Sequence, residues 1–379
     1  MLRGGIPIGK LFGISLKLHW SWFLIFGLIT WALTVVYFPT TYPNWSLALK
    51  VVAGLLTSLL FFASVLIHEI CHSLVAIHQG LEIESITLFF LGGVSQISGE
   101  PKSAGDEFRM AGAGPFSSLI LGGIFLIIFF ALRGTDTVPA QFGTAVAYYL
   151  GFINILLGIF NLIPGFPLDG GRVFRSIVWW RTKNMQSATR IASTVGRVFG
   201  FLFILAGIYL IFTGTYFLDG IWLILIGWFL ESAAAGSYRQ LILQDMLKGH
   251  TASEIMSQDC MTVSPDLTVE AVVNENIMTS GRRCFPVVEN DRTEGLMTLH
   301  NVRAVPREAW STTRVKEVMT PLGKVKAVSP DEDLNTVMQV LVQNDINQVP
   351  VVFEDKVVGI VARDNLMNFI NVRSELQKR

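Results

Sequence analysis

The chain has 379 residues, of which 51% are hydrophobic and only 15% are charged, and its mean hydropathy is +0.51. Soluble globular proteins carry about 25% charged residues, so this composition excludes that class and indicates a polytopic membrane protein with a soluble part. The net charge is zero and no long basic run occurs, so nothing indicates nucleic-acid binding. Three widely spaced cysteines, Cys71, Cys260 and Cys284, predict neither a disulfide framework nor a C-x-x-C metal site.

The N-terminal segment, up to Lys17, is glycine-rich and basic. It lacks the short apolar stretch and small-residue cleavage site of a signal peptide, so no cleavage is expected. Residues 18–38 follow without a formal charge, which is long enough for one membrane span, and their tryptophans suit a membrane interface. We expect His19, at the start of this span, to form an interfacial hydrogen bond and not to bind a metal.

The second apolar run, residues 51–77, contains the sequence His68-Glu69-Ile-Cys-His72. On a helix the two histidines lie one turn apart on the same face, which suits two ligands of one zinc ion, with Glu69 beside them as base for a zinc-bound water. Ionisable groups are costly inside a membrane helix and therefore mark a functional site. This motif predicts metalloprotease chemistry at membrane depth.

Two short runs with β-strand character follow at residues 83–88 and 93–98, and they predict a hairpin beside the helices. The third span is expected at residues 110–132. It opens with Ala111-Gly-Ala-Gly-Pro115, whose small residues allow another helix to approach closely.

A fourth span, at residues 142–164, leads into the sequence Asn161-Leu-Ile-Pro-Gly-Phe-Pro-Leu-Asp169. The two prolines break the helix, and irregular backbone at membrane depth is tolerated only where it lines a protein-enclosed or wet cavity. Asp169 is therefore expected near that cavity. A fifth and a sixth span are expected at residues 191–212 and 216–235.

The basic residues of the loops give an orientation. Residues 172–190 hold five Lys and Arg and the N-terminal segment holds three, whereas the other connections on the opposite side hold only Lys50 and Arg133. The positive-inside rule then places both termini and the hairpin in the cytosol. On that orientation His68 and Asp169 lie in the same half of the membrane, and Asp169 is a feasible third ligand that leaves the fourth zinc position open to water.

These two motifs, H-E-x-x-H in the second apolar segment and Asn161-x-x-Pro-x-x-Pro-x-Asp169-Gly some 90 residues later, resemble those of the site-2 protease family of intramembrane zinc metalloproteases. The resemblance covers about residues 1–235 and shows no PDZ-like insertion. It implies that His68, His72 and Asp169 bind zinc, that Glu69 is the general base, and that Asn161 holds the substrate strand or its oxyanion. It also implies that the hairpin guides an unfolded substrate segment. Ser117 and Ser118 stand where many relatives have an asparagine.

Residues 231–250 have the pattern of a polar helical connector, and an internal repeat of about 60 residues follows it. Phe285-Pro-Val-Val in the first copy recurs as Val349-Pro-Val-Val in the second. Each copy is expected to form helix, strand, helix, strand pair and helix, which resembles a CBS domain; a pair of these forms an adenosyl-ligand sensing module. Both copies lack the family's ribose-binding aspartate and have Asn301 and Asn365 there instead, so nucleotide binding and a purely structural or dimerising pair are both open.

The fold class expected is a polytopic α-helical membrane protein of about six transmembrane helices with a cytosolic α/β CBS pair. The expected domains are a transmembrane zinc metalloprotease at residues 1–235, a helical connector at 236–250, and CBS domains at 251–310 and 311–379. We expect the protein to lie in the cell membrane, to carry one Zn²⁺ per chain and to cleave transmembrane or membrane-associated protein substrates. The CBS domains are expected to form a homodimer and to regulate activity or assembly, with ATP, ADP or AMP as candidate ligands at Thr298, Asn301 and Asn365.

An alternative function is a CBS-regulated metal or ion transporter in which His68, His72 and Asp169 carry the ion. Glu69 discriminates between the two, because a transporter needs no base at this position whereas an endopeptidase needs one for turnover. A third possibility, an inactive membrane scaffold, is weakened by the complete ligand set.

Overall fold

The computed structural model describes residues 5–90, 92–99, 101–135, 137–214, 217–290 and 292–376. Tyr216, the first residue expected in the sixth span, lies outside these ranges. The chain divides into two compact units, residues 1–239 and 240–379. The domain boundaries expected from the sequence stay a prediction.

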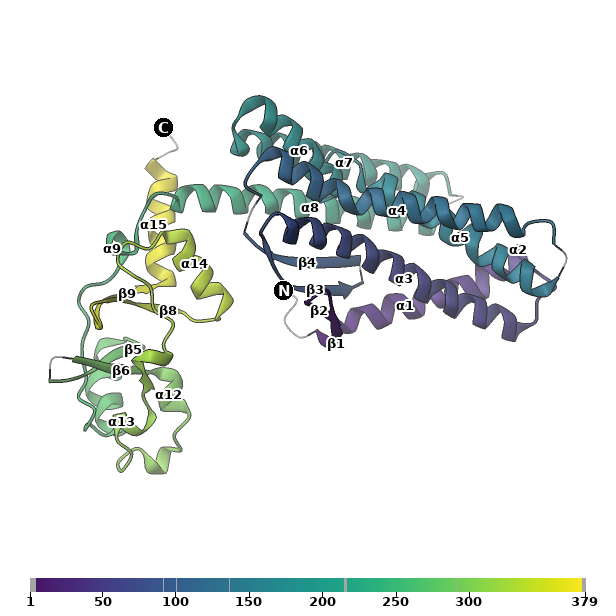
Figure 1. Ribbon diagram of the computed structural model, residues 1–379. Coiled ribbons are helices and arrows are strands. Elements are labelled where there is room, and N and C mark those ends of the chain that lie inside the picture. Colours follow the sequence, from purple (N-terminus) through teal and green to yellow (C-terminus); the bar gives the residue numbers. More distant parts are fainter. Residues whose placement is uncertain are drawn as a thin grey trace. The chain divides into compact units, whose positions relative to one another are not determined.

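Six helical segments of the described chain are long and apolar enough to cross a membrane. They are α1 (Trp20–Ala32) continued by η1 (Leu33–Tyr37) and α2 (Phe38–Thr41), α3 (Leu47–His78), α4 (Ala104–Leu132), α5 (Val138–Asn161), α7 (Met185–Phe212) and α8 (Phe217–Leu247). This confirms the expected six-span fold with the H-E-x-x-H motif in the second span, and Figure 1 shows α3, α4 and α5 side by side. His19 caps α1 by accepting a hydrogen bond from the Ser21 backbone, as expected of a hydrogen-bonding residue.

The helices differ from the expectation in two places. Residues 172–190, expected as a basic connection, lie largely in α6 (Asp169–Thr182) and the start of α7. The sixth span, expected to end near Ala235, and the helical connector expected at 236–250 form one continuous helix, α8, which ends at Leu247. In α8, residues with good helix propensity, among them Arg239, Gln240 and Leu241, continue the helix beyond its apolar span, whereas α6 is a separate helix that begins after the loop at 162–168.

The predicted hairpin is formed by β3 (Glu82–Phe89) and β4 (Gly92–Ser98). Two N-terminal strands that the sequence did not reveal, β1 (Ile6–Leu11) and β2 (Ile14–Leu18), extend it into a four-stranded sheet of order β1-β2-β3-β4, in which β2 and β3 are parallel. Ile14, Leu16 and Ile86 are buried against Ile70 of α3. The sheet is thereby fixed beside the helix turns that carry the H-E-x-x-H motif (Figure 1).

Glycines bring α7 and α8 into close contact. A Cβ atom at Gly207 of α7 would lie 2.5 Å from the Gly220 carbonyl oxygen of α8, and a Cβ atom at Gly220 would lie 2.6 Å from the Gly207 carbonyl oxygen. Two turns away, Gly200 and Gly227 make the same reciprocal approach. In a bilayer, where helices do not associate through the hydrophobic effect, such backbone contact is a main source of helix packing.

The second unit contains two similar halves. The first consists of α9 (Ala252–Ile255), α10 (Val269–Ala271), η2 (Val272–Ile277), α11 (Met278–Ser280), β5 (Cys284–Glu289), β6 (Arg292–Thr298), α12 (Leu299–Arg303) and η3 (Arg307–Ala309). The second consists of α13 (Val315–Val318), β7 (Thr320–Pro321), η4 (Leu322–Lys324), α14 (Leu334–Gln343), β8 (Gln348–Phe353), β9 (Lys356–Ala362) and α15 (Arg363–Leu376). The two hairpins carry bulges at matching places, Val287/Val288 and Val351/Val352, which confirms the α/β repeat.

The second unit has two buried cores, and each half contributes to both: Ala252 of α9 lies in the second core and Val315 of α13 in the first. Phe285, Val287 and Met297 lie in the first, and Leu341, Val349 and Val361 in the second. Leu247, the last residue of α8, is fully buried in the second core. The end of α8 is therefore part of the packing of the second unit.

The glycine contact between α7 and α8 generates a prediction. Gly207→Val should destabilise the protein, because the new side chain meets the Gly220 backbone; overpacking of this kind costs about 1–3 kcal/mol or more. Thermal unfolding in detergent measures the effect. Gly236→Ala in α8 is the control, since a Cβ there meets nothing within 4 Å. A Gly207→Val protein that unfolds at the wild-type temperature would contradict this account of the packing.

Candidate metal centre

Helix α3 supplies three of the predicted site residues. Ser46 caps its N-terminus by accepting a hydrogen bond from the Leu49 backbone, and the helix then runs without interruption to His78. His68 and His72 are one turn apart and are only 5% and 8% exposed. Their Nε2 atoms lie 3.2 Å from one another, so both imidazoles point to the same place, as the spacing predicted.

Asp169 reaches the histidines from a tightly folded loop. Residues 162–168, between α5 and α6, are irregular, and Asp169 is the first residue of α6. A Cβ atom at Gly170 would lie 2.3 Å from the Leu162 carbonyl carbon, so the loop can fold back on itself only with glycine here. In this position the Asp169 Oδ2 atom is 3.0 Å from His68 Nε2 and 3.1 Å from His72 Nε2.

The three atoms have the chemistry and spacing of a zinc site. Ligands bound to tetrahedral zinc at their usual distances of 2.0–2.2 Å lie about 3.3 Å from one another, close to the separations found here. Two imidazole nitrogens and one carboxylate oxygen also leave a fourth position free. Within the described residues, this is the one cluster of His, Cys, Asp and Glu side chains that could hold a metal ion. The residues present therefore fit zinc.

Helix α4 orients both imidazoles from behind. His72 Nδ1 donates to the Met110 carbonyl oxygen at 2.7 Å, and because a carbonyl only accepts, the lone pair of His72 stays on Nε2. His68 Nδ1 lies 2.9 Å from the Ser118 hydroxyl, which is fully buried. Between these two contacts Gly114 lets α4 approach α3, since a Cβ atom there would lie 2.1 Å from His72 Nε2.

Most of these supporting contacts leave no signal in the sequence. Ser118 belongs to neither motif, and its contact with His68 gives it a place in the site. Met110 acts through its backbone, so its side chain leaves no signal in the sequence. Gly114 was expected to serve helix packing, and here the packing is against the two histidines themselves.

Glu69 lies beside the three-atom cluster and is covered by the hairpin. Its Oε2 atom accepts a hydrogen bond from the Ser95 hydroxyl of β4 at 2.9 Å. A Cβ atom at Gly93, also in β4, would lie 2.3 Å from Glu69 Cγ, so the strand passes directly against the carboxylate side chain. Glu69 is half-buried, and the bond from Ser95 fixes its Oε2 atom.

Asn161 is the last residue of α5, one loop away from Asp169. Its side-chain amide donates to the Leu157 carbonyl oxygen at 3.0 Å, within the last turn of the helix. An amide group has two N–H bonds, and this contact uses one of them. The role expected for Asn161 stays a prediction.

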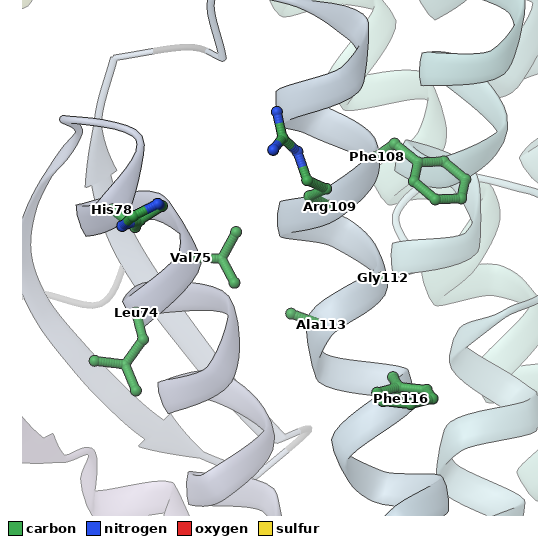
Figure 2. A pocket seen from close by; sticks show the side chains of 8 residues that line it. All are labelled: Leu74, Val75, His78, Phe108, Arg109, Gly112, Ala113 and Phe116. Atoms are coloured by element: carbon green, nitrogen blue, oxygen red, sulfur yellow. The ribbon is translucent and has the colours of Figure 1, made fainter.

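An apolar groove of about 620 Å³ lies between α3 and α4 (Figure 2). It is lined by Leu74, Val75, His78, Phe108, Arg109, Gly112, Ala113 and Phe116, none of which belongs to the cluster or to Glu69. In Figure 2, Val75 and Ala113 face the space between the helices, and His78 and Arg109 lie toward one end of it. Phe116 is 66% exposed, so the groove opens to the outside of the helices. We assign it no part in the chemistry.

A smaller cavity of about 90 Å³ lies in the second unit. It is lined by Ser257, Asp259, Cys260, Arg282, Cys284, Gln348, Ile360, Ala362 and Asn365. Small-molecule sites commonly measure about 300–1,000 Å³, so this cavity holds only part of a nucleotide unless it widens. Burial, together with the neighbouring Cys260, raises the pKa of the Cys284 thiol to about 12, and a protonated thiol is a poor metal ligand.

Of the three candidate nucleotide residues, only Asn365 lines this cavity. Thr298 and Asn301 close the N-terminus of α12 instead: the Asn301 Oδ1 atom accepts from the Thr298 backbone at 2.9 Å. The Asn301 amide also donates to the Val318 carbonyl oxygen at 2.8 Å. The polar atoms of these two residues are therefore engaged in capping.

Both parts of the chain, the membrane helices and the C-terminal repeat, are similar to known protein families. The model of peptidase family M50 matches residues 56–146 and 135–203, and the CBS domain model matches residues 252–308 and 315–372. "Putative zinc metalloprotease sll0528" of Synechocystis sp. is 34% identical over 97% of this chain and 95% of its own length. "Zinc metalloprotease MJ0392" of Methanocaldococcus jannaschii is 29% identical over 98% of each chain.

Among solved structures, the site-2 protease from Methanocaldococcus jannaschii shares 30% sequence identity, with 62% of this chain and 96% of that one covered and a TM-score of 0.43. The identity to the Synechocystis relative, over nearly the full length of both chains, establishes the family. This chain belongs to the site-2 protease family of membrane zinc metalloproteases, peptidase family M50, with a CBS domain pair.

Proposed function

We propose that this zinc metalloprotease is an intramembrane endopeptidase that cleaves transmembrane or membrane-associated protein segments. The observation that carries the proposal is the meeting of His68, His72 and Asp169 within 3.0–3.2 Å, inside a bundle of apolar helices. Ionisable groups persist at such a depth where function requires them. The ion-transporter alternative is not retained, because the chain belongs to a peptidase family.

In this proposal His68, His72 and Asp169 hold zinc and Glu69 is the general base. A zinc ion bound there would lower the pKa of a water molecule toward about 7 and polarise the scissile carbonyl. Glu69 accepts the proton of the attacking water and later passes it to the leaving amine. The Ser95 hydroxyl keeps the Glu69 carboxylate in one orientation by donating to Oε2, so that Oε1 can serve the water.

The substrate must be locally unwound, since a helix hides its carbonyl groups in its own hydrogen bonds. Strand β4 supports this view, because it lies at an edge of the four-stranded sheet and passes against Glu69. An extended segment that pairs with such an edge is held by backbone hydrogen bonds whatever its sequence. We infer that β4 presents the substrate strand to the base.

We further place the protein in the cell membrane with its termini and CBS pair in the cytosol, on the basic residues between 172 and 190. The CBS pair is proposed to regulate access to the metal centre or to set a homodimer. Arg282 and Asn365, which line the cavity of the second unit, are the side chains best suited to an adenosyl nucleotide. Such a ligand acts only through its different affinities for two arrangements of the protein.

The first prediction concerns metal content. His68→Ala, His72→Ala and Asp169→Ala should each lower bound zinc well below one ion per chain, because three protein ligands are the minimum of a catalytic site. Glu69→Gln should keep its zinc and lose turnover, since Glu69 is a base and not a ligand. Elemental analysis of purified protein, with cleavage of a single-span test substrate, checks both. Full zinc occupancy in Asp169→Ala would overturn the ligand assignment.

A second prediction concerns Asn161. Asn161→Ala should lower turnover by ~10²-fold at unchanged substrate affinity, which is typical of losing one donor to an oxyanion. Asn184→Ala, which removes the cap of α7, is the matched control and should cleave at the wild-type rate. Equal rates for Asn161→Ala and wild type, with substrate bound normally, would show that the amide does not act on the substrate.

A third prediction concerns the CBS pair. ATP, ADP or AMP should change the cleavage rate of the full chain by a factor within the usual 5- to 150-fold range of allosteric coupling. Arg282→Gln should weaken nucleotide binding by about 10-fold or more, because it removes a charged donor. Arg283→Gln is the control, since Arg283 is exposed and does not line the cavity. Nucleotide binding is measured by calorimetry. If no binding is detected and the cleavage rates do not change, the CBS pair is an assembly module and not a nucleotide sensor.

A further inference from the structure

We infer that the buried ion pair of Glu107 and Arg175 is a positioning pair for the metal centre: it sets the register of α6, which begins with Asp169, against α4, which orients both histidines. The inference rests on the proposed zinc site. The two residues are 68 positions apart in the chain and belong to neither of the motifs from which the function was predicted.

The pair is unusually enclosed. Glu107 is fully buried and Arg175 is 8% exposed. Arg175 Nε donates to Glu107 Oε1 at 2.7 Å, and Arg175 Nη2 donates to the same oxygen. The guanidinium group also packs on the Phe166 ring, with its Cζ atom 5.2 Å from the ring centroid. Since Phe166 belongs to the loop that leads to Asp169, Arg175 fixes both sides of that aspartate.

Both partners lie close to the metal centre along their own helices. Glu107 is one turn before Met110, whose carbonyl oxygen holds the His72 imidazole. Arg175 is six residues after Asp169, about 9 Å along α6 at 1.5 Å per residue. Sliding or tilting α6 against α4 would therefore break the ion pair and also move Asp169 Oδ2 away from the two Nε2 atoms.

Stability alone is a weak reason for this pair. Burying two charges is unfavourable, and apolar residues of the same volume often stabilise a protein as well or better. Glu107 Oε2 moreover has no hydrogen-bond partner among the described residues, so the carboxylate is only partly satisfied. Arg172 Nε, also on α6, lies 3.9 Å from Glu107 Oε1 and directs a second positive charge to the same carboxylate. With both arginines directed at the Glu107 carboxylate, this cluster favours one position of α6 relative to α4.

The test measures zinc affinity of the full-length protein by competition with a chelator of known affinity. Glu107→Gln keeps the size of the side chain and removes its charge, and we expect zinc binding to weaken by about 10- to 100-fold, as for other residues that support metal ligands. The charge exchange Glu107→Arg with Arg175→Glu should recover part of the loss. Thermal unfolding of each protein is recorded in parallel.

Arg197→Gln is the matched control. It breaks another Arg–Glu pair between helices, Arg197 Nε to Glu231 Oε1 at 3.0 Å, which joins α7 to α8 and does not involve α4 or α6. Its zinc affinity should equal that of the wild type even if its unfolding temperature falls. This separates a loss of stability from a loss of ligand position.

Should Glu107→Gln fail to fold, the double variant Glu107→Met with Arg175→Met replaces the pair by apolar side chains and takes its place. Wild-type zinc affinity in a folded Glu107→Gln or double-Met protein would overturn the inference. If the proposed zinc site itself is wrong, the Asp169→Ala protein will also bind zinc normally. That result distinguishes failure of the site from failure of the positioning role. Weakened zinc binding in either variant, with binding intact in Arg197→Gln, supports the positioning role.

Discussion

Ionisable groups in an apolar helix bundle need partners, since an unpaired charge at membrane depth costs several kcal/mol. Asp169 faces both histidine Nε2 atoms, and the far side of each imidazole meets α4, at Met110 and Ser118. Glu69 is held by Ser95. The same polar contacts therefore orient the site residues and hold the elements together, because each contact joins two different helices or strands.

Helix α4 is where these contacts converge. Glu107, Met110 and Gly114 lie in its first three turns and Ser118 lies at its middle, so one face of the helix touches α6 and then both histidines. Gly114 allows this approach because any larger residue would occupy the space of the imidazoles. The sheet lies on the other side of the site and brings the Ser95 hydroxyl to Glu69.

The sequence predicted the parts of the site that follow from local periodicity. The spacing of His68 and His72 places them on one helix face, and the prolines before Asp169 break the helix where the structure has an irregular loop. The hairpin and the C-terminal repeat were likewise visible as patterns of short strands.

Contacts between distant segments could not be predicted in this way. The pairing of β2 with β3 joins the N-terminus to the hairpin, and the Glu107–Arg175 pair joins α4 to α6. Neither leaves a pattern in any one window of sequence. Thr298 and Asn301 illustrate another limit: Thr-x-x-Asn fits a nucleotide contact and a helix cap equally well, and only the fold shows that here it forms a cap.

The central claim, that two imidazoles and one carboxylate hold the metal, is tested most directly by X-ray absorption spectroscopy at the zinc edge of the purified, zinc-loaded protein. The account predicts a shell of nitrogen and oxygen ligands at about 2.0–2.2 Å, with the scattering pattern of two imidazoles and no sulfur. A sulfur ligand at about 2.3 Å would contradict it, because that distance marks a cysteine, and Cys71 lies next to His72 in the motif.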